Sequence, residues 1–200
     1  MISAQKALGI LKEGNKRFVA NQSAELHRTH KLIDNQTPFT IVLSCSDSRV
    51  PPEIVFDQGI GDMFIIRVAG NIVTPVELGS AEFAALNFGT RLLVVMGHTK
   101  CGAVQATIQT TQTEPSKKPT LSQGLQTIVD QIATSVNENT DHTNNDSVNE
   151  VIKANVINSA QRLHTESKAI ADLTKNDGLM IVGAVYAIET GTVEFFDIPK

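Results

Sequence analysis

Four short runs of almost entirely apolar residues constrain the fold of this chain more than any other feature. Such runs are typical of strands that are buried on both faces of a parallel sheet. They cover Phe39–Ser44, Met63–Val68, Leu92–Met96 and Leu179–Tyr186, and Thr192–Phe196 follows as a last strand after a turn at Glu189–Gly191. Helical patterns occupy Val76–Phe88, Gly102–Gln109, Leu121–Val136 and Ser147–Leu173. Because strands and helices alternate, the sequence predicts an α/β fold with a mostly parallel central sheet flanked by helices.

The N-terminal segment 1–35 differs from this pattern, and we interpret it as a helical arm of a single domain over residues 1–200. Ser3 opens a helical pattern that runs through Ala20 and carries apolar side chains on one face. Such a stripe needs cover, either from the domain or from a partner subunit. Two polar segments, Gln112–Thr120 and Asn137–Ser147, are expected to be surface loops because neither can supply a core.

Charge and hydropathy argue against two classes of partner. Lys and Arg number 17 against 21 Asp and Glu, a net charge of −4, whereas nucleic-acid binding usually needs a basic face. The apolar runs are too short to cross a bilayer, and the first residues lack the apolar core of a secretory signal. We therefore expect no nucleic-acid or membrane partner and a cytoplasmic location, where the two cysteines have no need to form a disulfide.

Cys45, His98 and Cys101 form a candidate metal-binding set. Cys45 follows the first predicted strand and Cys101 follows the third, and ligand sites in open parallel sheets gather at such strand ends. His98 lies three residues before Cys101 in GHTKCG. Thiolates and imidazole suit zinc, and three protein ligands with an open fourth position are typical of a catalytic zinc site. The alternatives are ordinary buried cysteines or a redox pair, although the chain has no CxxC.

The residues after Cys45, in CSDSRV, add a candidate catalytic pair. An Asp47 carboxylate paired with Arg49 would stay ionised and oriented, and it would accept a hydrogen bond from a water on the metal. The competing interpretation is that Ser46, Asp47 or Ser48 caps a helix that begins near Pro51 or Pro52. The residues by themselves leave both interpretations open.

CSDSRV followed about fifty residues later by GHTKCG resembles the β-class carbonic anhydrases. The resemblance extends over nearly the whole chain and includes GNKRF in the first helix, FIIRVAGN at Phe64–Asn71, GSAEFA at Gly79–Ala84 and VGAVYAIETGTVEFF near the end. It implies the reversible hydration of carbon dioxide to bicarbonate and a proton by a zinc-bound hydroxide, with one Zn²⁺ per chain. It also implies a final antiparallel strand and an N-terminal arm that packs on a partner subunit, in a homodimer or a dimer of dimers.

The same resemblance implies roles for individual residues. Cys45, His98 and Cys101 match the zinc ligands, and Asp47 with Arg49 matches the pair that orients the hydroxide. Gln36 matches a residue that reaches the neighbouring subunit's substrate pocket, Phe64 and Ala69 match pocket-lining positions, and the backbone N–H of Gly102 would face the metal site. Because two thiolates leave zinc less able to polarise water than three imidazoles do, activity is expected to rise toward alkaline pH.

Two departures from the family pattern bear on regulation and on the pocket. Val42 stands where some members carry a Trp of a regulatory bicarbonate site, whose other two positions match Arg67 and Tyr186. We therefore expect that this site is lost and that Asp47 stays on Arg49, leaving the zinc open. Phe83 stands where many members carry Tyr.

Other functions compete with carbon dioxide hydration. Hydrolysis of carbonyl sulfide or carbon disulfide on the same scaffold is the alternative activity, since relatives with the same ligands and pair carry it out. A zinc-holding structural protein and a redox-sensing thiol protein are alternatives from other classes. An intact Asp47–Arg49 pair favours an enzyme over the structural protein, and a redox sensor would be expected to keep its function in a chelator and lose it in a thiol oxidant.

Overall fold

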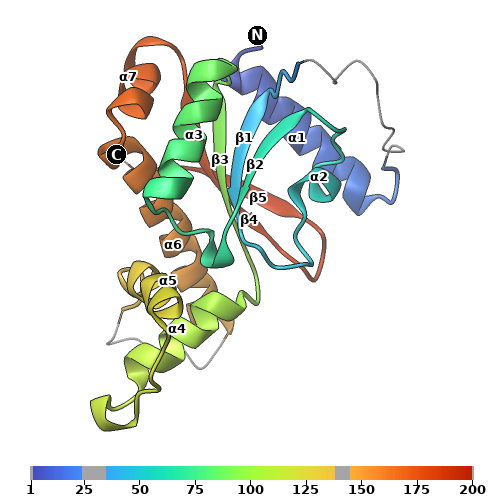
Figure 1. Ribbon diagram of the computed structural model, residues 1–200. Coiled ribbons are helices and arrows are strands. Elements are labelled where there is room, and N and C mark those ends of the chain that lie inside the picture. Colours follow the sequence, from blue (N-terminus) through green and yellow to red (C-terminus); the bar gives the residue numbers. More distant parts are fainter. Residues whose placement is uncertain (1, 24–34, 138–144, 200) are drawn as a thin grey trace.

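The fold is described by a computed structural model that covers residues 2–23, 35–137 and 145–199 (Figure 1). A five-stranded sheet in the order β2-β1-β3-β4-β5 forms its centre. The strands are β1 (Thr40–Ser44), β2 (Met63–Arg67), β3 (Leu92–His98), β4 (Met180–Tyr186) and β5 (Val193–Asp197). β1 to β4 run parallel, and β5 pairs antiparallel with β4. The predicted α/β architecture with an antiparallel edge strand is confirmed.

Helices cover both faces of the sheet, which explains why the central strands have no polar face. Every residue of β1 and β3 is buried. On one face Val42, Val94 and Val182 share a core with α1 (Ala4–Val19) and α2 (Pro52–Val55). On the other face the alternate side chains pack with α3 (Pro75–Asn87), α6 (Asn145–Glu166) and α7 (Lys168–Asn176).

Beyond the carboxyl end of β3 lie the elements that surround the candidate site. They are η2 (Ala69–Asn71), α4 (Gly102–Gln112) and α5 (Gln123–Ala133), and the short exposed helix η3 (Pro115–Lys117) connects α4 to α5. α4 and α5 lie below the sheet in Figure 1, and both pack against η2. The segment expected to be a loop at Gln112–Thr120 is largely exposed, although α4 runs three residues further than predicted.

Much of the apolar stripe of α1 is covered by its own chain, while Val19 stays 41% exposed, and the packing of α1 on a partner subunit stays a prediction. Leu11 is fully buried in the core beside the sheet. The buried Asn15 donates from Nδ2 to the carbonyls of Val55 (3.0 Å) and Gly191 (2.8 Å), and its Oδ1 accepts from the amide of Val193 (2.9 Å). These bonds fix α1 to α2 and to the β4–β5 turn, and they satisfy groups that burial would otherwise leave without a partner.

The helix expected over Ser147–Leu173 is two helices, α6 and α7, which are separated at Ser167. The Ser167 hydroxyl accepts from the amide of Ile170 (3.0 Å) and donates to Glu82 Oε1 (2.5 Å). It thus caps α7, while the apolar periodicity continues across the break and hides it from sequence reasoning. α6 begins at Asn145, inside the segment expected to be a loop. None of the described helices is both long and apolar enough to span a membrane.

Candidate metal centre

Two neighbouring parallel strands bring Cys45, His98 and Cys101 together. Cys45 follows β1 directly, His98 is the last residue of β3, and Cys101 immediately precedes α4. Because β1 and β3 are paired in parallel, their carboxyl ends meet at one edge of the sheet. The ligand atoms of the three residues lie within 4.8 Å of one another, and all three side chains are buried. Both cysteines are free thiols.

His98 is oriented as a metal ligand. Its Nδ1 lies 2.8 Å from the carbonyl oxygen of Thr99. A carbonyl oxygen only accepts hydrogen bonds, so Nδ1 carries the proton and Nε2 presents its lone pair. Nε2 is buried and has no hydrogen-bond partner among the described residues, an arrangement that is costly unless the lone pair binds a cation.

The two thiols favour the loss of a first proton and resist the loss of a second. The pKa of Cys45 is lowered to about 4, chiefly because the Cys101 thiol donates a hydrogen bond to it; the amide of Gly70, 3.3 Å from Sγ, also contributes. The same hydrogen bond, burial and the negative charge on Cys45 raise the pKa of Cys101, although the first amides of α4 oppose the shift. A bound cation would remove this conflict, because it compensates the charge of both thiolates. Two sulfurs and one imidazole nitrogen fit zinc.

Gly70 supplies its amide to Cys45 through a backbone conformation that other residues rarely adopt. Its φ is +70°, and a Cβ there would lie 2.6 Å from Ile132 Cδ1. The Gly70 carbonyl accepts from Nδ2 of the buried Asn155 (2.8 Å), so α6 holds the peptide in place from the far side. The glycine of the AGN sequence is therefore required by geometry.

Asp47 is held by Arg49 rather than used as a helix cap. Arg49 donates from its Nε to Asp47 Oδ1 (2.9 Å), from its Nη2 to Oδ2 (2.7 Å) and from its backbone amide to Oδ1 (2.9 Å). These bonds hold the pKa of Asp47 well below its usual range. α2 instead begins after Pro51 without any side-chain cap, so the capping interpretation is wrong. Oδ2 lies 4.0 Å from His98 Nε2, which places the carboxylate beside the metal position.

Arg67 is a residue of the site that sequence reasoning assigned to another role. Its Nε donates to the carbonyl of Cys45 (3.1 Å), and its Nη2 donates to the carbonyl of Asp47 (2.6 Å). Arg67 therefore fixes the backbone of the CSDSRV segment through hydrogen bonds from the neighbouring strand. No local pattern in the sequence shows this role, because it depends on the pairing of Arg67, the last residue of β2, with Ser44, the last residue of β1.

The four predicted substrate-pocket residues do not all reach this centre within one chain. Ala69 adjoins Gly70, and Gly102 follows Cys101 as the first residue of α4. Phe64 pairs in register with Ile41. Ile41 lies four residues before Cys45, so Phe64 is level with a point about 13 Å along the strand from Cys45. Gln36 is exposed and precedes β1. A pocket that joins Phe64 and Gln36 to the metal centre stays a prediction, and it requires a partner subunit.

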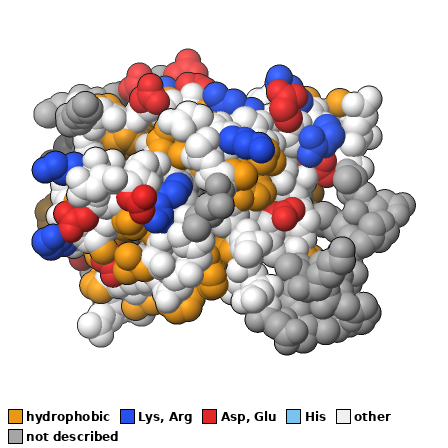
Figure 2. All heavy atoms as spheres, turned by 90° about the horizontal axis from the view of Figure 1, so that it is seen from above, with side chains coloured by type: hydrophobic (Ala, Val, Ile, Leu, Met, Phe, Trp, Pro, Cys, Tyr) orange, Lys and Arg blue, Asp and Glu red, His pale blue; other side chains and the backbone are white. Residues whose placement is uncertain are grey.

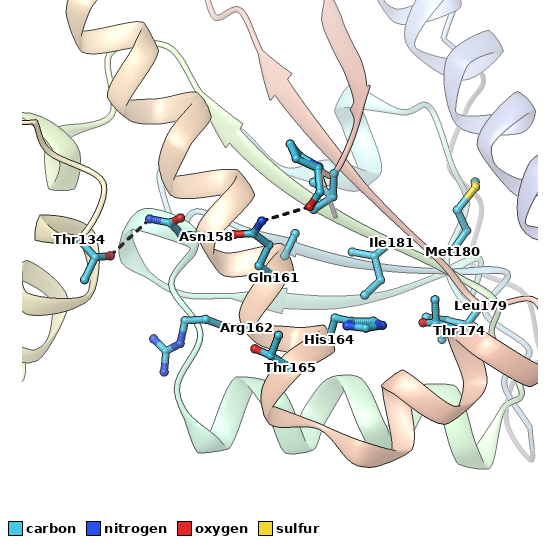
Figure 3. Close-up of a pocket in the computed structure, with 13 residues that line it drawn as sticks. Thr134, Asn158, Gln161, Arg162, His164, Thr165, Thr174, Leu179, Met180 and Ile181 are labelled. Carbon is cyan, nitrogen blue, oxygen red and sulfur yellow. Dashed lines mark hydrogen bonds between the residues drawn. The ribbon is translucent and has the colours of Figure 1, made fainter.

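A hollow of the described structure lies away from this centre (Figure 3). It measures about 980 Å³ and is lined by α6, α7, the start of β4 and the last described residues. The metal centre adjoins the other end of β4, where Tyr186 pairs with His98. Within the hollow, Arg162 is engaged by Glu166 (2.6 Å) and His164 is exposed. None of the residues that line the hollow belongs to the metal centre, so we give the hollow no role in the chemistry there.

Comparisons with known proteins identify the family of this chain. The family model described as carbonic anhydrase matches residues 40–193. Carbonic anhydrase 2 of Mycobacterium tuberculosis is 35% identical over 195 residues, which cover 95% of this chain and 90% of that relative. The carbonic anhydrase of Mycolicibacterium smegmatis is 47% identical over 111 residues, or 54% of this chain and 52% of its own.

Solved structures show the same fold. The β-carbonic anhydrase CcaA superposes with a TM-score of 0.71 at 25% identity, over 96% of this chain and 86% of that one. A tetrameric β-carbonic anhydrase of Sordaria macrospora gives a TM-score of 0.69 at 20% identity, over 96% of this chain and 92% of that one. Because the family model matches most of the chain and a relative is 35% identical along nearly its full length, this chain belongs to the β-carbonic anhydrase family.

Proposed function

We propose that this enzyme catalyses the reversible hydration of carbon dioxide to bicarbonate and a proton, with one zinc ion per chain. The observation that carries the proposal is the convergence of Cys45, His98 and Cys101 within 4.8 Å, beside an Asp47 carboxylate held by Arg49. Zinc in such a site acidifies water so that a nucleophile is available near neutral pH, and carbonic anhydrases are the standard example of this effect.

Asp47 orients the reacting water. An ionised carboxylate only accepts hydrogen bonds, and both of its oxygens are fixed in place by Arg49. Its Oδ2 lies 4.0 Å from Nε2 of His98 and, as a carboxylate oxygen, can accept a further hydrogen bond beside that from Arg49. A water at the metal position would donate a hydrogen bond to Asp47, which would leave an oxygen lone pair free to face carbon dioxide. Because Arg49 holds both oxygens, the carboxylate would stay off a bound metal and leave its fourth position open.

The start of α4 supplies the opposite kind of group. The first amides of a helix lack partners within the helix and carry partial positive charge. Here the amides of Ala103 and Val104 face the sulfur of Cys101, and their hydrogen bonds favour its thiolate. The Gly102 amide is at the same helix end, where it would stabilise negative charge that develops on the oxygens of the substrate.

The rate of hydration is expected to rise between about pH 6 and pH 9. A centre with two thiolates acidifies water less than one with three imidazoles, so the nucleophile forms at higher pH. Asp47 does not contribute to the rise, because its lowered pKa keeps it ionised throughout this range and it loses its charge only in strong acid. Stopped-flow rates at constant ionic strength give the profile, and a flat profile would contradict this account.

The working unit in this proposal is a homodimer or a dimer of dimers. An exposed apolar patch on α3 and the edge strand β2 supports it. The rings of Phe64, Phe83 and Phe88 pack on one another with centroids 5.6 to 6.2 Å apart, and Phe83 is 52% exposed. Val76 and Leu86 extend the patch along α3 and are more exposed still. Figure 2 shows hydrophobic side chains that reach the surface between charged ones.

A charge on this α3 patch is expected to break the dimer. Phe83→Glu would place a carboxylate among Phe64, Phe88 and the partner surface, so we expect a shift to monomer at micromolar concentration in sedimentation or light-scattering measurements. Leu125→Glu, at a similarly exposed position on α5, is the matched control. An unchanged mass for Phe83→Glu, or a monomeric unmodified protein, would show that the patch is not the interface.

Stopped-flow hydration of carbon dioxide tests the proposed reaction, with metal-depleted protein and zinc-restored protein as paired samples. The comparisons described above lend no support to the hydrolysis of carbonyl sulfide or carbon disulfide. That activity would gain support only if zinc-loaded protein failed to hydrate carbon dioxide. The cytoplasmic location stays a prediction from the sequence.

A further inference from the structure

Thr99 connects the zinc ligand His98 to a distant turn of the chain. Its carbonyl oxygen accepts the hydrogen bond from His98 Nδ1 (2.8 Å), which sets the orientation of the imidazole ring. Its amide donates to the carbonyl of Tyr186 (2.9 Å), and its hydroxyl accepts from the amide of Ile188 (3.0 Å). The position of the Thr99 peptide, and with it that of the ring, is thus defined by the segment that leaves β4.

Glu189 completes this connection. Its Oε2 accepts from the Thr99 hydroxyl (2.7 Å), and its Oε1 pairs with Lys100 Nζ (3.2 Å). Both residues between the ligands His98 and Cys101 therefore contact one carboxylate of the β4–β5 turn. The hydroxyl of Thr99, together with Lys100 and a backbone amide, lowers the pKa of Glu189 to about 2, so the carboxylate stays available as an acceptor in neutral solution.

The backbone between the two ligands needs such support. Lys100 has a φ of +56°, in the left-handed region that residues other than glycine adopt only when their surroundings enforce it. This conformation turns the chain from the end of β3 into α4 within two residues, so that His98 and Cys101 face the same point. Arg49 Nη2 also approaches the Lys100 carbonyl (3.4 Å), which links the loop to the catalytic pair.

We propose that Glu189 and Thr99 are positioning residues that hold His98 in its metal-binding orientation, so that the β4–β5 turn sets how tightly the centre keeps zinc. The inference rests on the zinc centre of the proposed function and not on the reaction carried out there. Groups that orient a metal-bound histidine typically contribute about 10- to 100-fold to metal affinity. Neither residue touches the metal or the substrate.

Thr99→Val and Glu189→Ala test the inference through metal retention. Each is expected to speed the transfer of zinc to a chromophoric chelator about tenfold. In cobalt-substituted protein each is expected to change the visible absorption bands, which report the geometry of the ligands and do not respond to a loss of stability elsewhere. Thr99→Ser keeps the hydroxyl and is expected to match the unmodified protein in both measurements.

Thr190→Val is the matched control, because the Thr190 hydroxyl lies in the same turn but bonds only to Thr192 (2.7 Å) among the described residues. It is expected to leave zinc release and the cobalt spectrum unchanged. If Thr99→Val does not fold, Glu189→Ala decides alone, since the Glu189 side chain is 43% exposed. Unchanged zinc release and an unchanged spectrum in Glu189→Ala would overturn the inference. A zinc-loaded but inactive unmodified protein would instead overturn the proposed reaction.

Discussion

Serine in place of Cys45 is expected to leave the purified protein without bound zinc and to lower carbon dioxide hydration by about a thousandfold or more. Sites built from a few cysteines and histidines bind zinc with a free energy on the order of 12 kcal/mol. One ligand of three then accounts for about 4 kcal/mol of that free energy, or a factor of about a thousand in zinc affinity. Cys45 also accepts the amide of Gly70 and the thiol of Cys101, so its loss disturbs the whole centre. Metal analysis and stopped-flow rates measure the two effects.

Ser44→Ala is a suitable control for this variant. Ser44 is the neighbouring residue, it is fully buried, and its hydroxyl has no hydrogen-bond partner among the described residues. Removal of that hydroxyl is therefore expected to leave zinc content and rate unchanged and to cost no stability. A Cys45→Ser protein that keeps one zinc per chain and the full rate would show that the metal is bound elsewhere.

Asparagine in place of Asp47 is expected to keep the zinc and to lose about a hundredfold or more in kcat. The amide is nearly isosteric with the carboxylate, but only one of its two terminal atoms is an oxygen. It therefore cannot accept hydrogen bonds from Arg49 at both positions and another from the reacting water. The free amide N–H₂ repels the donor groups of Arg49. The expected result is a loss in kcat larger than any change in KM, because the orientation of water acts on the chemical step.

Asp177→Asn is the matched control for this second variant. Asp177 pairs with Arg91 at the end of α7, so the same kind of ion pair is removed at a place remote from the centre. A surface pair of this kind contributes about 0 to 1 kcal/mol, and its loss is expected to leave kcat unchanged. If Asp47→Asn retained kcat within about threefold at full zinc occupancy, the assignment of Asp47 to the reacting water would be wrong.

Most of the sheet could be predicted from the sequence because its strands are buried on both faces and appear as unbroken apolar runs. β3 shows the limit of that signal. Its apolar run ends at Met96, but the strand continues through Gly97 to His98, and this extension is what brings the imidazole to the edge where Cys45 lies. The break at Ser167 and the burial of the α1 stripe within its own chain depend on long-range contacts with Glu82 and with Gly191, which no local pattern contains.

The candidate ligands could be predicted because strand ends in a parallel sheet converge, and the resemblance to the family then assigned their roles. The residues that hold these ligands could not. Arg67 acts through the β1–β2 register, and Glu189 contacts Thr99 across 90 positions of sequence. Such hydrogen bonds have no periodicity or spacing that a sequence displays. The pocket that the family implies for Phe64 and Gln36 stays a prediction, because it would include a partner subunit.

The central claim is that this protein hydrates carbon dioxide at a zinc ion held by Cys45, His98 and Cys101. Stopped-flow hydration near pH 8.5, on protein whose zinc content and mass in solution are determined in the same preparation, tests it most directly. The expected result is fast turnover at one zinc per chain, loss of turnover when the metal is removed and its return when zinc is restored. An absence of turnover in an oligomeric protein with one zinc per chain would contradict it.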